Sequence, residues 1–164
     1  MNIDKTLSDT PRNASRRWPN WMALSVVAFA CLTMGATASQ AASGVTVEKP
    51  WMRFIIKARP AGGYFTLHNG TSKAMQLIGA SSPACGMVML HQTKNENGIE
   101  KMLPVKGVTV PAHGMIKFQP GGYHLMCMKP KDTMVVGHKV PVTLKFAGGG
   151  AVTAPFPVKG VGGN

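Results

Sequence analysis

Residues 87–105 read MVMLHQTKNENGIEKMLPV, and this stretch indicates the fold class more directly than any other. Asn95–Gly98 is a strong hairpin signal, because Asn-Gly pairs readily adopt the positive backbone angles that tight hairpin turns require. Met87–Thr93 leads into this turn and Ile99–Val105 returns from it, so both segments are expected to be strands. The sequence therefore predicts an antiparallel pair at the centre of a β protein.

Short strands and turn signals continue in both directions from the hairpin, at intervals of about 8–12 residues. No segment shows a sustained helical period with caps, so almost no helix is expected. About eight strands in one domain predict an all-β Greek-key sandwich or barrel. Besides the hairpin, the expected strands are Val45–Ile56 (interrupted by Pro50), Gly63–Asn69, Ala74–Ala80, Met115–Gln119, Tyr123–Met128, Val140–Phe146 and Val152–Val158.

The composition agrees with a turn-rich β protein and excludes several other classes. The 164 residues include 19 Gly and 12 Pro without a collagen-like period, and no Gly-rich stretch opens a helix as a phosphate-binding loop would. The formal net charge is +12, but the basic residues are scattered, mostly Lys, and not interleaved with aromatic residues. This pattern does not predict nucleic-acid binding; in an exported protein it favours an acidic partner or a membrane surface.

The first 42 residues have the three parts of a secretory signal peptide. A polar region with four basic residues precedes the apolar run 21–34, WMALSVVAFACLTM, and the small residues GATASQAAS come after it. Cleavage is expected after Ala41 or Ala42. Residues 1–42 are therefore predicted as the cleaved signal peptide, residues 43–158 as the folded domain, and residues 159–164 as a short flexible tail.

Export by the general secretory (Sec) route is favoured over the two alternatives. Ser15-Arg16-Arg17 hints only weakly at a twin-arginine signal, because Pro19-Asn20 separates the two arginines from the apolar run. Cys31 suggests a lipoprotein, but Ala28-Phe29-Ala30 is a poor lipidation box and apolar residues continue after the cysteine. The mature domain is expected outside the cytoplasm, where disulfides persist.

The hairpin strands carry residue types that bind soft metal ions. Cu(I) prefers thioether, imidazole or thiolate ligands. If Asn95–Gly98 forms a four-residue loop, His91 lies directly opposite Met102; if Asn97-Gly98 alone forms the loop, the two residues are diagonal neighbours. Either register places both side chains on one face of the hairpin.

A second His–Met pair occurs on the expected strand 123–128. Alternation places His124, Met126 and Met128 on one face of this strand and Cys127 on the other. Methionine on a strand is more often core filling than a ligand, and periodicity alone does not bring the two pairs together. From the residues alone, a metal site and ordinary packing both remain open.

The spacing of these four residues resembles that of a known family. His91, Met102, His124 and Met126 match the pattern His-x10-Met-x21-His-x-Met of the periplasmic copper chaperone family called PCuAC. The resemblance covers nearly the whole mature domain. Its flanking motifs are Trp51-Met52-Arg53, Leu67-His68-Asn69, Gly79-Ala80-Ser81-Ser82-Pro83-Ala84 and Pro120-Gly121-Gly122-Tyr123-His124-Leu125-Met126.

The resemblance implies a fold, a ligand and a role. It implies a cupredoxin-like β-sandwich in which His91, Met102, His124 and Met126 hold one Cu(I). It also implies delivery of copper in the periplasm to the CuA centre of cytochrome c oxidase, with subunit II or another copper-transfer protein as the partner. A monomer is expected.

Four further residues bear on this site. Cys85 and Cys127 stand where members of the family have aliphatic or small residues. They could form a disulfide, remain independent buried thiols, or bring Cys127 to the copper; strand alternation argues against the last of these. Met89 and Met128 share a face with the predicted ligands and could form an outer edge of the site.

Two other functions compete with the copper carrier: a thiol or copper redox enzyme, and a metal-free β-sandwich interaction module. The enzyme lacks support, because the chain has no Cys-x-x-Cys, no Ser/His/Asp set and no evident acid–base pair. The module does not explain nine methionines after residue 42, or their spacing with histidine. The sequence therefore favours a non-enzymatic copper carrier.

Overall fold

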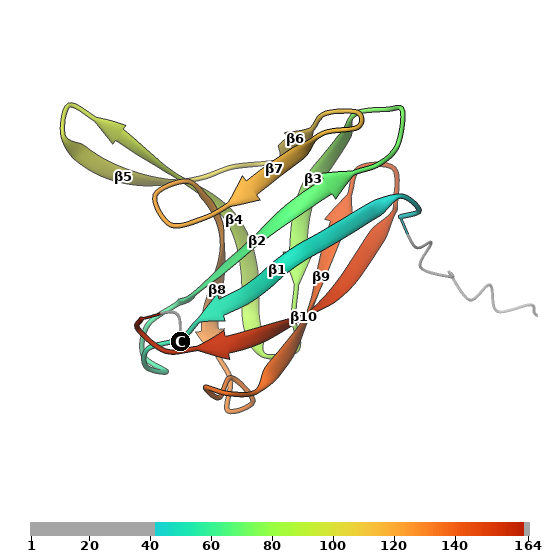
Figure 1. Cartoon of the computed structure of the whole chain (residues 1–164). Helices are drawn as coiled ribbons and strands as arrows, with labels where there is room; N and C mark the ends of the chain where they lie inside the picture. Colours follow the sequence, from blue (N-terminus) through green and yellow to red (C-terminus); the bar gives the residue numbers. More distant parts are fainter. Residues whose placement is uncertain (1–41, 163–164) are drawn as a thin grey trace, which may run out of the picture. The chain divides into compact units, whose positions relative to one another are not determined.

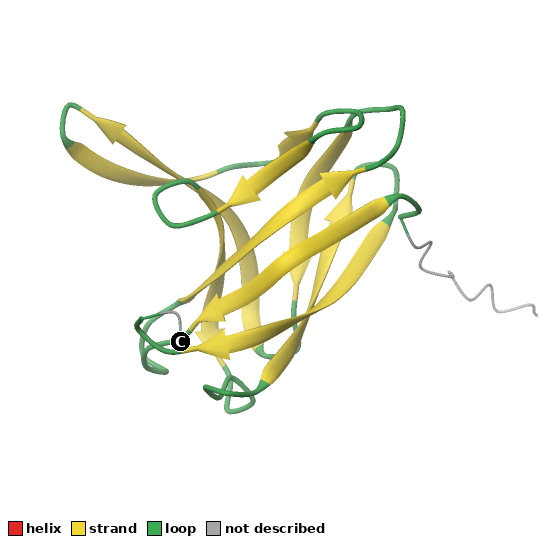
Figure 2. Ribbon diagram, viewed as in Figure 1, coloured by secondary structure: helices red, strands yellow, loops and turns green. Residues whose placement is uncertain are grey.

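Ten β-strands and no helix make up residues 42–162, the part of the chain that the computed structural model describes (Figure 1). Figure 2 shows only strands and loops there, and none of it could cross a membrane as a long apolar helix. The all-β class is confirmed. The strands are β1 (Val45–Arg53), β2 (Ala61–Asn69), β3 (Met75–Ser81), β4 (Cys85–Glu96), β5 (Ile99–Pro104), β6 (Val108–Val110), β7 (Met115–Phe118), β8 (Tyr123–Pro130), β9 (Lys139–Phe146) and β10 (Ala151–Lys159).

The strand number exceeds the expected value of about eight. The sequence pattern does not predict β6, because its three residues are too few to show a period. β10 ends at Lys159, one residue beyond the predicted end of the domain. The predicted signal peptide lies outside the described residues except for Ala42, and it stays a prediction.

The strands pair in the order β5-β4-β8-β7-β2-β1-β10-β9-β3-β6, and β8 also pairs with β2. Several neighbours are distant in sequence, as Greek-key connections require. Figure 1 shows the sheet folding over, so that β3 and β9 lie behind β1 and β2. The two halves enclose one core, which confirms the predicted β-sandwich.

The core fixes which residues of β8 face outward. Leu125 of β8 is fully buried together with Leu67 of β2 and Phe156 of β10. Full burial of such a side chain contributes about 1.5–3 kcal/mol. Because side chains alternate along a strand, His124 and Met126 on either side of Leu125 point to the outer face of the sheet.

A β-bulge in β1 reverses the faces of its second half. Val45 and Val47 face the core before the bulge, whereas Met52 is fully buried after it. The register with β2 shifts between Glu48 and Trp51, so the strand continues through the proline at which the sequence predicts an interruption. As a result, Trp51 and Arg53 lie on the same outer face as His124.

A disulfide joins Cys85, the first residue of β4, to Cys127 of β8, with Cα atoms 5.4 Å apart. Both residues belong to the core, with exposed fractions of 4% and 0%. Among the three alternatives open from the sequence, the structure has the disulfide. Cys127 faces away from His124 and Met126, as strand alternation predicts.

The β4–β5 hairpin turns at Asn97 and Gly98, whose φ angles are 55° and 83°. This two-residue turn places Met102 opposite Thr93 and Pro104 opposite His91. Of the two registers considered, the hairpin has the one in which His91 and Met102 are diagonal neighbours. All six residues of β5 are exposed, and Figure 1 shows the hairpin extending away from the sandwich.

Candidate metal centre

The outer face of β4 and β8 brings the two predicted histidines together. His91 lies directly opposite His124 in the antiparallel register, and the ring centroids are 5.9 Å apart. In the next row of the same face, Met89 pairs with Met126. Pairing of β4 with β8 therefore joins the two His–Met pairs that the sequence could not bring together.

His124 is held in one tautomer by its own strand. It is 5% exposed, and its Nδ1 lies 3.1 Å from the carbonyl oxygen of Gly122. A carbonyl can only accept, so Nδ1–H donates, and in the neutral ring Nε2 then carries the lone pair. Nε2 is buried and has no hydrogen-bond partner within the described residues. A buried imidazole nitrogen in this state is suited to bind a metal ion.

His91 has both ring nitrogens buried, and neither has a hydrogen-bond partner in the part of the chain that the structure describes. Burial lowers the pKa of His91, and the neighbouring His124 lowers it further. Both effects favour the neutral imidazole, which is the form that binds metal ions. The two rings are direct neighbours across the strand pair, and each can donate a nitrogen lone pair in its neutral form.

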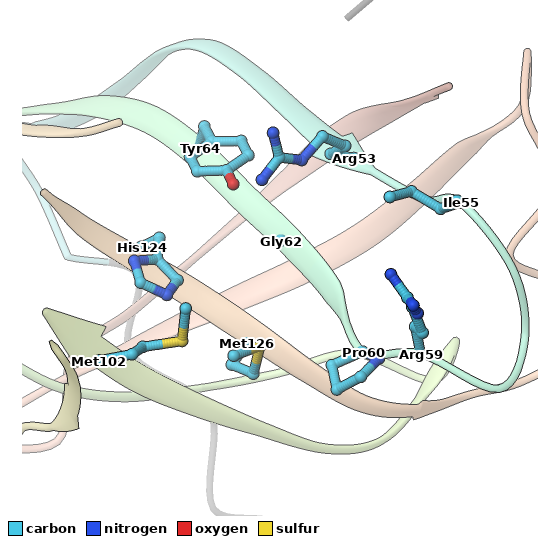
Figure 3. Close-up of a pocket in the computed structure, with 9 residues that line it drawn as sticks. All are labelled: Arg53, Ile55, Arg59, Pro60, Gly62, Tyr64, Met102, His124 and Met126. Carbon is cyan, nitrogen blue, oxygen red and sulfur yellow. The ribbon is translucent and has the colours of Figure 1, made fainter. Parts of the chain in front are cut away.

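The two predicted methionine ligands differ in setting. Met126 is half-buried on β8, whereas Met102 on β5 is 51% exposed. Together with His124 they line a pocket of about 210 Å³. Figure 3 shows the Met102 side chain extending toward the His124 ring, with Met126 beside it. His91 is not part of this lining; it joins the group through its pairing with His124.

The two methionines expected at the outer edge lie on the same face. Met89 is half-buried opposite Met126, and Met128 lies opposite Met87, which is 56% exposed. Thioethers therefore continue along the face for two rows beyond the histidines. This arrangement leaves Met89 nearer to the predicted ligands than Met128.

Residues of β1 and β2 that the sequence did not predict border the site on its other side. Tyr64 lies between Trp51 and His124, with ring centroids 4.7 Å from Trp51 and 6.4 Å from His124. Arg53 places its guanidinium carbon 5.5 Å from the centre of the Tyr64 ring. The motif Trp51-Met52-Arg53 was a signal, but its outward orientation depends on the bulge in β1.

The donor set is chemically soft and uncharged. It contains two neutral imidazoles and two thioethers, and none of the residues that line the pocket is acidic. Thioether and imidazole donors suit Cu(I), whereas Zn(II) prefers thiolate, imidazole and carboxylate. The residues present therefore fit Cu(I) as a bound cargo.

Comparison with known proteins places the chain in a family. The family model described as "Putative lipoprotein LpqE-like" matches residues 45–158. The protein named "Putative lipoprotein Lxx21020", from Leifsonia xyli subsp. xyli (strain CTCB07), is 34% identical over 128 residues. That match covers 77% of this chain and 76% of the relative.

Solved structures show the same fold. The copper-bound PCuAC domain from PmoF2 matches with a TM-score of 0.61 and 22% identity, over 76% of this chain and 99% of that domain. The solution structure of CuI-DR1885 from Deinococcus radiodurans matches with a TM-score of 0.54 and 30% identity, over 74% of this chain and 79% of that protein. The cupredoxin-like β-sandwich predicted from the sequence is confirmed.

Proposed function

The chain belongs to the LpqE-like family and shares the fold of PCuAC copper-chaperone domains, as its motif predicted, and from this premise we propose that it carries one Cu(I) ion. The proposed ligands are His91, Met102, His124 and Met126. One observation carries the assignment: the ring centroids of His91 and His124 lie 5.9 Å apart beside two thioethers, and each ring has a buried nitrogen without a hydrogen-bond partner among the described residues. Such nitrogens cost free energy unless they bind something.

The proposed role is transport of copper rather than catalysis. Four soft ligands complete the coordination that Cu(I) prefers and leave no position for a substrate. The disulfide between Cys85 and Cys127 is buried in the core, so it is poorly placed for thiol exchange with another protein. Both points favour a carrier over a thiol or copper redox enzyme.

We place this carrier in the cell envelope. The family description and the relative in Leifsonia xyli are both named as lipoproteins, which are exported. The finer proposal is a monomer in the periplasm, delivered there by the predicted signal peptide. It passes Cu(I) to the CuA centre of cytochrome c oxidase, through subunit II, or to another periplasmic copper-transfer protein.

A metal titration tests the proposal. The copper-free protein is titrated with Cu(I) under ascorbate, which keeps copper reduced while leaving the disulfide intact, and in parallel with Cu(II) and Zn(II). We expect one Cu(I) per chain and far weaker binding of Zn(II), because thioethers are poor ligands for zinc. Equal affinity for Zn(II) and Cu(I) would contradict the thioether assignment, and absence of Cu(I) binding would favour the metal-free module.

A further inference from the structure

The pocket beside the proposed copper ligands has a second, positively charged wall. Arg53 and Arg59 line it together with Ile55, Pro60, Gly62 and Tyr64. Figure 3 shows the two arginines on the opposite side of the pocket from Met102, Met126 and His124. One cavity therefore presents soft metal donors on one side and two guanidinium groups on the other.

Arginine is otherwise missing from this domain. The chain has 18 Lys and Arg, and four precede residue 43; of the 14 that come after it, 12 are Lys, and the two Arg are Arg53 and Arg59. Both line the same pocket. The planar guanidinium binds carboxylates with two parallel hydrogen bonds, which the ammonium of Lys cannot do.

No ion pair between described residues includes either arginine. Those pairs are Lys57–Asp132, His68–Glu48 and Lys101–Glu96. Glu100 lines the neighbouring pocket on the hairpin side, which Arg53 also borders, and Asp132 pairs with Lys57 of the loop that carries Arg59; neither carboxylate makes an ion pair with an arginine. The donors of both guanidiniums are therefore available to a ligand.

The fold positions Arg53 over an aromatic ring. Arg53 is the last residue of β1 and lies opposite Gly62, and its guanidinium carbon is 5.5 Å from the centre of the Tyr64 ring. A Cβ atom at Gly62 would come within 2.7 Å of the Tyr64 hydroxyl oxygen, so a larger residue here would displace the ring from its present position. Stacking on an aromatic face orients a guanidinium and leaves its edge free for an anion.

The positive charge of the proposed cargo favours an anion beside these groups. Two neutral imidazoles and two thioethers leave Cu(I) with its full positive charge. Two guanidiniums in the same pocket raise the positive potential around it, and the cost grows as the pocket is closed off from water. An anion between the guanidiniums and the copper would remove this cost.

We propose that Arg53 and Arg59 form a subsite for a carboxylate on the molecule that gives copper to this domain or receives it. The identity of that molecule as a copper-exchange partner rests on the proposed function, whereas the subsite itself does not. The ligand class is an anion with paired oxygens, supplied by a free organic acid or by an acidic side chain of a protein. Its binding and that of Cu(I) strengthen each other, because the carboxylate attracts the cation and coupling between two ligands is reciprocal.

The experiment begins with the copper-free protein and succinate, with binding measured by calorimetry or by backbone NMR shifts. Succinamide, which has nearly the same shape and no charge, is the control ligand. A short blocked peptide with two Asp residues and its Asn counterpart test the protein source of the carboxylate. We expect binding of succinate or of the Asp peptide, and no binding of the neutral counterparts; the ligand that binds identifies the source.

Four variants locate the site. Arg59 lies in an exposed loop, so Arg59→Gln leaves the core intact. Arg59→Gln and Arg53→Gln should each weaken anion binding at least tenfold, about 1.4 kcal/mol. Arg53→Lys keeps the positive charge but loses the planar guanidinium that makes two parallel hydrogen bonds, so it should weaken anion binding by an intermediate amount. Lys145→Gln removes an equal charge from an exposed position on β9 and should bind as the parent does.

The outcomes separate the subsite from the proposed function. If neither anion binds, or if Lys145→Gln weakens binding as much as the arginine variants do, the subsite is wrong. Loading one equivalent of Cu(I) should tighten anion binding in the parent; no change would overturn the assignment to a copper-exchange partner. A protein that binds succinate through the arginines but takes up no Cu(I) would leave the subsite standing while the copper carrier fails.

Discussion

The two ends of β4 are held in opposite ways. At its first residue, Cys85 is buried and joined by a disulfide to Cys127 of β8. At its other end, the strand continues into a hairpin whose partner strand β5 is exposed along all six residues. His91 lies between these ends, where β4 is still paired with β8.

This difference divides the proposed site into a fixed part and a movable part. His91, His124 and Met126 lie on strands that the core and the disulfide hold together. Met102 lies on the exposed strand of the hairpin and is itself half exposed. Segments with few buried contacts open at low free-energy cost, so Met102 is the proposed ligand that a copper acceptor would displace first.

The largest expected effect comes from removal of the fixed imidazoles. His91→Ala and His124→Ala should each weaken Cu(I) binding, and the double variant should abolish it, because only two thioethers remain. Competition with a Cu(I) chelator measures the affinity, and circular dichroism checks the fold. His138→Ala, at an exposed loop position, is the control and should bind as the parent does. A double variant that still takes up one Cu(I) at parental affinity would refute the site.

The disulfide should matter for stability and not for copper. The double change of Cys85 and Cys127 to Ala removes a cross-link between residues separated by 42 positions. Such a loss costs about 2–4 kcal/mol of unfolding free energy, which chemical denaturation measures. One Cu(I) should still bind, because Cys127 faces the core. Loss of copper from a variant that is still folded would mean that a cysteine contributes to the site.

The methionine variants test both parts of the site at once. Met102→Leu and Met126→Leu remove sulfur and keep apolar volume, a change that usually costs less than ~1.5 kcal/mol in stability. Cu(I) affinity should fall more than tenfold in each, about 1.4 kcal/mol or more. Met102→Leu should leave the melting temperature unchanged, because Met102 is half exposed.

Met75→Leu is the matched control for these variants. Met75 lies on β3 and packs against the core from the other half of the sheet, away from the site. It should bind Cu(I) nearly as the parent does. If Met102→Leu and Met126→Leu also bind like the parent, these methionines are packing residues and the ligands lie elsewhere.

The site shows clearly how far the sequence can predict structure. Strand alternation alone is sufficient to separate His124 and Met126 from Cys127, because a period of two does not depend on tertiary contacts. The hairpin turn limited His91 and Met102 to two registers on one face. The choice between them depended on whether the loop contained two or four residues, which the Asn95–Gly98 run leaves open.

Contacts between distant strands could not be predicted in this way. Nothing local to β4 or β8 indicates that His91 pairs with His124, since that register depends on how the whole sheet is ordered. The outward orientation of Arg53 could not be predicted from the sequence for a similar reason. Without the bulge before Trp51, the alternation that buries Val45 would also turn Arg53 toward the core.

The smallest expected effect comes from the hairpin turn itself. Gly98 has φ +83° and no atom within 4 Å of a built Cβ, so Gly98→Ala adds backbone strain without a steric clash. An L-residue in this region costs about 1–2 kcal/mol. The strain falls on the hairpin that carries Met102, but the Met102 sulfur is still present. Cu(I) affinity should therefore drop by less than in Met102→Leu.

Gly148→Ala separates this effect from general destabilisation. Gly148 has φ +86°, also has no atom within 4 Å of a built Cβ, and lies in the turn between β9 and β10. The two variants carry the same kind of strain at two turns, but only Gly98 adjoins a strand with a proposed ligand. We expect both variants to lower the melting temperature, Gly148→Ala to leave Cu(I) affinity at the parental value, and Gly98→Ala to lower it. Equal copper affinities in the two variants would show that the hairpin does not set the position of Met102.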